Sequence, residues 1–236
     1  MFERLPEAQA LKKEGNELFV KDRFAEAAAK YNDALVRLPT IELPENDQGE
    51  TGEGASDAVN ADDANNDDTA EPEEGEPQGV SLEEHLANEE AINLRTALHC
   101  NLAACYLKLE QYNDAVKAST LALSDDELNV KALHRRATAY EGLGKWTDLE
   151  KALKDYQRLA ELDKEGYVPT AYGPELRASL ERVPKMIQLV GEAEKNEMLG
   201  KLKGIGNSIL GYFGLSTDNF KMTQQPGGGY SVNLEQ

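Results

Sequence analysis

The stretch Ala10-Leu11-Lys12-Lys13-Glu14-Gly15-Asn16-Glu17-Leu18-Phe19 decides the fold of the chain. Its apolar residues recur at spacings of three and four, which predicts an amphipathic helix whose packing face includes Gly15. Lys12 and Asn16 are four residues apart and therefore share a second, neighbouring face. A glycine inside a helix costs about 1 kcal/mol relative to alanine. We therefore expect Gly15 to allow the close approach of a second helix.

The helix-turn-helix pattern that begins here recurs later in the chain. Ala103 and Ala137 repeat the small residue at Gly15, and they are 34 residues apart. The periodicity predicts helices over residues 6–19, 24–38, 81–109, 111–123, 129–143 and 147–162. In the third copy Leu149 stands where the first two copies have an aromatic residue, so we expect about three extra residues in its turn.

This period and residue pattern resemble the tetratricopeptide repeat family. The resemblance covers residues 8–39 and 96–165. It implies an all-α fold, a solenoid of three helix-turn-helix repeats followed by a long C-terminal capping helix. In such a solenoid the first helix of each repeat lines the concave side. Residues 198–232 also resemble the C-terminal signature of the tetratricopeptide repeat protein 1 group.

The composition divides the chain into unequal parts. Of the 44 acidic residues, 18 lie in residues 40–94, which contain no Lys or Arg; the rest has 26 acidic against 25 basic residues. The net charge of -19 therefore belongs to one insert. We expect residues 6–39 to form repeat 1 and residues 40–80 to form an acidic disordered insert. Residues 81–129 should form repeat 2 with an N-terminally extended helix, and residues 130–166 should form repeat 3. The capping helix with an extension is expected at 172–213, and a tail or small hairpin at 214–236.

Five polar residues fall at the concave positions of the three first helices, namely Lys12, Asn16, Asn101, Lys131 and Arg135. They resemble the two-carboxylate clamp of co-chaperone repeat domains. Those domains bind the Glu-Glu-Val-Asp tails of Hsp70 and Hsp90, so the resemblance implies that these residues grip a terminal carboxylate and an Asp side chain. For any one of these residues taken alone, the alternative interpretation is a side chain on a solvated helix face. Arg136 is a rival for the guanidinium role, but it falls at a buried-type position of the repeat.

The resulting prediction is a cytoplasmic protein-interaction adaptor, a co-chaperone. The alternative is a signalling scaffold that binds G-protein or small GTPase partners through the convex face or the C-terminal segment. We expect no enzyme activity, cofactor or metal, because no nucleophile–His–acid set, phosphate loop or metal spacing is present. We expect no nucleic-acid or membrane partner either, because no strongly basic face and no apolar run of bilayer length occur.

The remaining candidate residues have simpler explanations. Cys100 and Cys105 fit buried reduced thiols in a helix. The histidines fit surface or packing roles, and they are His85, His99 and His134. An apolar stripe near the C-terminus favours core packing over a membrane anchor, and it comprises Leu199, Leu202, Ile205, Ile209, Leu210 and Phe213. The acidic insert either occupies the cationic groove in cis or is a solvated loop.

Overall fold

The computed structural model describes residues 4–38, 82–224 and 228–234. Within these ranges the α-helices are α1 Leu5–Val20, α2 Phe24–Arg37, α3 Leu82–Lys108, α4 Tyr112–Asp125, α5 Val130–Leu143, α6 Trp146–Lys164 and α7 Gly173–Gly211. The short 3-10 helix η2 Thr170–Tyr172 precedes α7, and η3 Thr217–Asn219 follows it. Strands β1 Phe220–Gln224 and β2 Tyr230–Leu234 pair antiparallel as a hairpin. The acidic insert expected at 40–80 lies outside the described residues.

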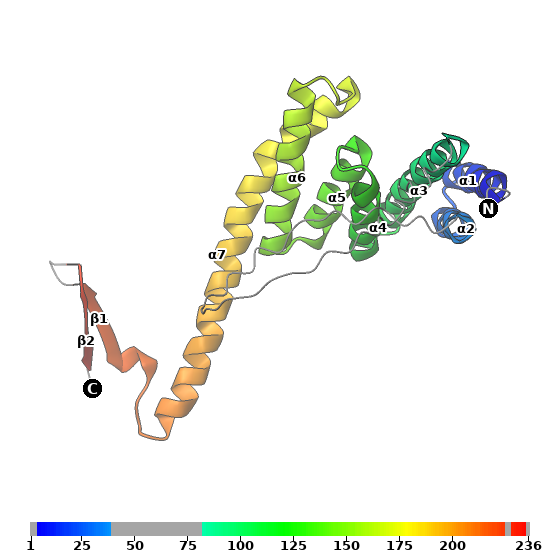
Figure 1. Ribbon diagram of the computed structural model, residues 1–236. Helices are drawn as coiled ribbons and strands as arrows, with labels where there is room; N and C mark the ends of the chain where they lie inside the picture. Colours follow the sequence, from blue (N-terminus) through cyan, green and yellow to red (C-terminus); the bar gives the residue numbers. More distant parts are fainter. Residues whose placement is uncertain (1–3, 39–81, 225–227, 235–236) are drawn as a thin grey trace, which may run out of the picture.

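The helices pack in sequential pairs. Helix α1 packs on α2, α3 on α4 and α5 on α6, and each pair packs on the next (Figure 1). Helix α7 then packs along α6 and closes the stack. The expected all-α solenoid of three helix pairs with a long C-terminal helix is confirmed. The hairpin at 220–234 lies in the region expected to form a tail or a small hairpin.

Small residues on the first helix of each pair set the distance between helices. A Cβ built on Gly15 would stand 2.5 Å from Cε1 of Tyr31, which is only 1% exposed in α2. The equivalent positions in the later repeats are Ala103 and Ala137, and both are completely buried. At Gly15 even a methyl group would overlap the ring, and the later repeats carry no more than a methyl group at this position. The expected role of Gly15 in close helix packing is therefore confirmed.

The third repeat does not contain the longer turn that its sequence suggested. Helix α6 begins at Trp146, after a turn of two residues whose first, a glycine, has a φ of 68° and caps α5. Trp146 lies as far beyond Ala137 as Phe24 lies beyond Gly15, so the repeat needs no insertion. The aromatic residue of this repeat is thus Trp146. Leu149, the residue expected at the aromatic position, is a fully buried residue one turn later.

The distal part of α7 also departs from expectation. Helix α7 spans 39 residues, continues through Pro184 and runs past the ends of α5 and α6 (Figure 1). The stripe expected to pack in a core is largely exposed, because α7 runs antiparallel to α6 and extends beyond its first residue, Trp146. Only Leu210 of that stripe is half-buried. Among the helices of the described ranges, none combines the length and apolar character needed to cross a bilayer.

We predict that Gly15→Ala lowers the free energy of unfolding by about 1–3 kcal/mol, as overpacking does elsewhere. The new methyl group would overlap the buried ring of Tyr31, which outweighs the gain of about 1 kcal/mol in helix propensity. Urea denaturation followed by circular dichroism measures the change.

Gly200→Ala is the matched control, because a Cβ on Gly200 in α7 meets no atom within 4 Å. This variant is expected to unfold at the wild-type urea concentration or above it. Equal destabilisation by the two substitutions would contradict the close-packing role of Gly15.

Candidate functional site

The first helices of the three repeats meet at one cavity. Asn16 from α1, Asn101 from α3 and Arg135 from α5 line it, and its volume is about 220 Å³. Its remaining walls are Phe19, Val20, Tyr31 and Ala104. Three of the five residues predicted from the sequence thus share one concave space, although 85 residues separate Asn16 from Asn101 along the chain.

The side-chain amide of Asn16 is held in one orientation. Its Oδ1 accepts a hydrogen bond of 2.8 Å from the hydroxyl of Tyr31 and one of 3.2 Å from Nδ2 of Asn101. An amide oxygen has two acceptor sites, so both are used. The Nδ2 group of Asn16 therefore remains as the donor for a ligand. Asn101 keeps its own Oδ1 as an acceptor and one N–H as a donor.

Arg135 is anchored to the neighbouring repeat. Its Nη1 donates a hydrogen bond of 2.6 Å to the backbone carbonyl of Cys100 in α3. This contact uses one of the five guanidinium N–H groups and holds the positive charge at the cavity. Arg136 points elsewhere, since it forms two hydrogen bonds of 2.8 Å with the carboxylate of Asp155. Arg136 is half-buried, as Arg135 is, and its pairing with Asp155 takes it away from the cavity.

Lys131 lies beside a second cavity of about 190 Å³, which Asn101 and Cys100 also line. The two cavities therefore share a wall. The second also contains the carboxylate of Asp126, which hydrogen-bonds to the backbone N–H of Leu128. A negative charge there opposes anion binding, so the first cavity is the better place for a carboxylate.

Lys12 lines neither cavity. It is half-buried on α1, four residues before Asn16, and so stands one turn away on the same helix face. Neither Lys12 nor Lys131 forms an ion pair with any residue in the described ranges. Both ammonium groups are therefore available to an anionic ligand that extends out of the first cavity.

The sequence did not identify four wall residues, of which Tyr31 matters most. Tyr31 lies on the buried face of α2, and its contact with Asn16 was not predicted. A usable signal existed, because a tyrosine on a buried face needs a partner for its hydroxyl. Burial raises the pKa of Tyr31 to about 12, so its hydroxyl remains a donor at pH values where an ordinary tyrosine ionises.

Both cysteines are withdrawn from solvent, whereas His99 and His134 are half-buried and His85 is exposed. Cys100 and Cys105 are buried free thiols, as expected, and burial raises the pKa of Cys105 to about 11. Burial lowers the pKa of His99 and of His134 below the usual range for imidazole. Among the residues that the structure describes, no group of His, Cys, Asp or Glu side chains could hold a metal ion.

Comparison with known proteins agrees with the geometry, although no family model matches the chain. The C-terminal TPR-containing domain of a Plasmodium falciparum FK506-binding protein superimposes with a TM-score of 0.52 at 25% identity, over 82% of this chain and 94% of that one. The fold is a tetratricopeptide repeat solenoid. The first cavity lies where α1, α3 and α5, the first helices of the three pairs, come together.

Two plant proteins are similar in sequence over part of their length. The peptidyl-prolyl cis-trans isomerase FKBP42 of Arabidopsis thaliana is 32% identical over 114 residues, which are 48% of this chain and 30% of that protein. Outer envelope protein 61 of the same plant is 31% identical over 158 residues, 67% of this chain and 20% of that protein. The matches span less than a third of either relative.

The neighbouring arginines Arg135 and Arg136 are predicted to differ sharply in their effect on stability. Arg136→Ala leaves the buried carboxylate of Asp155 without its partner, which costs about 3–5 kcal/mol. Arg135→Ala loses one hydrogen bond to a carbonyl and costs about 1.5 kcal/mol. Urea denaturation at pH 7 compares the two variants. Equal losses would contradict the separate roles assigned to the two side chains.

The titration of Tyr31 gives a second prediction. Its folded-state pKa of about 12 exceeds the ordinary value of about 10, so the folded state retains the proton longer. Stability from this group is complete below pH 10 and is lost as the pH rises toward 12. The measurement is the phenolate absorbance as a function of pH for the wild type and for Tyr31→Phe. The difference between the two curves should show one group titrating near pH 12. A difference curve centred near 10 would contradict the buried, protonated hydroxyl.

Proposed function

We propose that the chain is a protein-interaction adaptor whose concave groove binds the acidic C-terminal tail of a chaperone. The tail is of the Glu-Glu-Val-Asp type carried by Hsp70 and Hsp90. The single observation that carries the proposal is the convergence of Asn16, Asn101 and Arg135 on one cavity from three different repeats. Co-chaperone action in the cytoplasm follows from this proposal and from the resemblance of the five groove residues to a two-carboxylate clamp.

The chemistry of the cavity suits a chain terminus ending in Asp. Such a terminus carries two carboxylates close together, and each can accept several hydrogen bonds. Nδ2 of Asn16 supplies a fixed donor, and the guanidinium of Arg135 supplies charge and further donors. Oδ1 of Asn101 can accept a backbone N–H of the peptide. Charge-assisted bonds of this kind contribute about 1.5–3 kcal/mol each.

The groove extends beyond the terminal residue in two directions. Phe19, Val20 and Ala104 form an apolar part of the cavity wall, which suits an aliphatic side chain near the end of the peptide. Lys12 and Lys131 stand outside the cavity, where they can meet acidic side chains further along the tail. Their ammonium groups act as point charges, so salt should weaken this part of the interaction most.

The alternative, a signalling scaffold for G-protein or small GTPase partners, stays a prediction. It rests on the resemblance of residues 198–232 to tetratricopeptide repeat protein 1, and it concerns the convex face or the C-terminal segment, apart from the groove. Adaptor and scaffold can therefore be separated by the residues on which binding depends.

A titration tests the proposal. Isothermal calorimetry of the chain with an acidic peptide ending in Glu-Glu-Val-Asp should give a dissociation constant in the micromolar range. This corresponds to a binding free energy of about -8 kcal/mol. Lys12→Ala should weaken binding about tenfold, and Arg135→Ala about tenfold to a hundredfold, because each removes a charged partner of a carboxylate.

Two controls sharpen the result. Lys117→Ala removes an exposed lysine of α4, outside the groove, and should leave the affinity unchanged. A peptide with an amidated C-terminus lacks the terminal charge and should bind at least about tenfold more weakly. Unchanged affinity for the amidated peptide, or equal losses from Lys117→Ala and Arg135→Ala, would contradict a carboxylate-binding groove.

A further inference from the structure

The distal part of α7 carries an apolar face with no partner among the described residues. Seven large apolar side chains are 51% to 91% exposed, namely Met198, Leu199, Leu202, Ile205, Ile209, Tyr212 and Phe213. Five of them follow one another at spacings of four, three, four and three, beginning at Met198 and ending at Tyr212. This is the heptad spacing of a helix that pairs with another helix.

The glycines of this segment indicate that another protein surface packs on its apolar face. Gly200 and Gly204 lie inside the helix, and a Cβ on either would meet no atom within 4 Å. Each internal glycine weakens a helix by about 1 kcal/mol, and helices in proteins are stabilised mainly by packing of an apolar face. A glycine-containing helix with its apolar face in water lacks that stabilisation.

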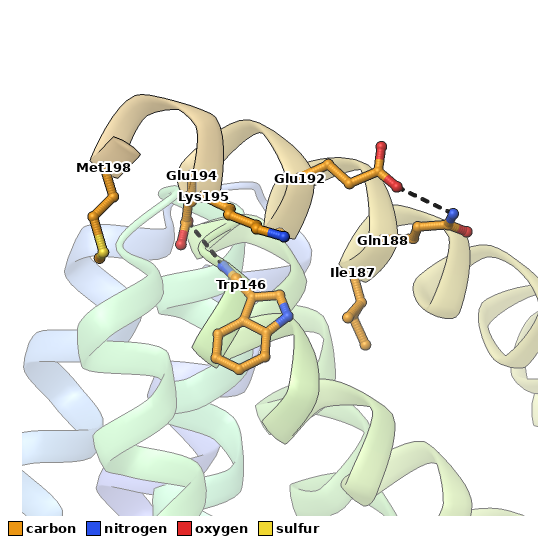
Figure 2. A pocket seen from close by; sticks show the side chains of 8 residues that line it. Trp146, Ile187, Gln188, Glu192, Glu194, Lys195 and Met198 are labelled. Carbon is orange, nitrogen blue, oxygen red and sulfur yellow. Dashed lines mark hydrogen bonds between the residues drawn. The ribbon is translucent and has the colours of Figure 1, made fainter. Parts of the chain in front are cut away.

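The same face of α7 continues into a cavity of about 500 Å³ beside α6. Figure 2 shows the indole of Trp146 below α7, between the side chains of Met198 and Ile187. The indole packs so closely on Gly191 that a Cβ there would stand 3.0 Å from Cδ1 of the ring. The backbone N–H of Trp146 donates a hydrogen bond to Glu194 on α7, which holds this corner together.

We propose that a second copy of the chain covers this face, with the two distal α7 segments antiparallel. In the register that fits the heptad spacing, Met198 faces the second copy's Ile209 and Leu202 faces its Ile205. The same register brings the second copy's Tyr212 opposite Lys195, at the edge of the Trp146 cavity. The aromatic pair at 212–213 of each copy then fills the cavity of the other.

The exposed area matches what a stable dimer requires. A large apolar side chain has roughly 150–250 Å² of surface, so seven that are more than half exposed leave on the order of 800 Å² uncovered. A specific interface of standard size buries about 800 Å² on each partner. The distal face of one copy therefore supplies the apolar surface that its half of the interface needs.

Charge and shape favour the antiparallel arrangement. Lys201 pairs with Glu197 in its own helix, so its charge is already balanced beside the apolar face. The ammonium of Lys195 comes within reach of the Tyr212 ring, a favourable contact between a cation and an aromatic face. The solenoid lies along the first half of α7 only (Figure 1). Antiparallel pairing thus keeps the two solenoids at opposite ends of the dimer.

The single tryptophan makes the proposal directly measurable, because Trp146 is 38% exposed in one copy and would be covered in the dimer. Sedimentation of the full chain should show the mass changing from monomer to dimer as the concentration rises from about 1 to 200 µM. Dissociation constants of weak dimers typically fall in this concentration range. The emission of Trp146 should shift to shorter wavelength over the same concentrations. A monomer mass up to the highest concentration would overturn the proposal.

Three variants identify the interface. Leu202→Asp should weaken dimerisation at least about tenfold. Tyr212→Ala combined with Phe213→Ala should abolish the concentration-dependent emission shift. Leu189→Asp is the matched control, since Leu189 is 68% exposed on the opposite side of the same helix, and it should leave the dimer unchanged. Equal weakening by Leu189→Asp and Leu202→Asp would overturn the proposed face.

A lipid surface is the rival occupant of an amphipathic face. Vesicles of phosphatidylcholine and phosphatidylserine test it in the same sedimentation experiment. A chain that stays monomeric and sediments with the vesicles through Leu202 would assign the face to lipid and overturn the second-copy proposal.

Discussion

The contact between the backbone of Gly15 and the ring of Tyr31 links the packing of the solenoid to its groove. The missing side chain at Gly15 lets α2 approach α1 until the Tyr31 ring lies against the α1 backbone. At that distance the Tyr31 hydroxyl reaches Oδ1 of Asn16, which points its N–H groups into the cavity. The close helix packing of the first repeat and the orientation of a ligand donor are thus consequences of the same contact.

Sequence periodicity was sufficient for the helices and for much of the groove. Small residues at the Gly15, Ala103 and Ala137 positions indicated the pairing of helices, and the repeat register placed Asn16, Asn101 and Arg135 on first helices. These features depend on local spacing, which a single sequence displays directly. The offset from Ala137 to Trp146 equals that from Gly15 to Phe24, and it identifies Trp146 as the aromatic position in place of Leu149.

Features that depend on contacts between distant segments could not be read in this way. The bond from Tyr31 to Asn16 and that from Arg135 to the carbonyl of Cys100 join residues 15 and 35 positions apart. The exposure of the distal α7 stripe follows from where α6 begins, since an apolar periodicity looks the same whether or not a partner helix lies alongside. The groove and the distal part of α7 are separate surfaces, so tail binding and self-association need not compete.

The most direct measurement of the central claim follows the side-chain amide signals of Asn16 and Asn101 by NMR during titration with an acidic tail peptide. The account predicts that both amides shift and saturate with the free-acid peptide, and that the amidated peptide moves them little at the same concentration. Such a response would locate the terminal carboxylate at the amide donors of Asn16 and Asn101, beside Arg135. Unmoved amides at saturating peptide, with shifts confined to residues outside the groove, would contradict it.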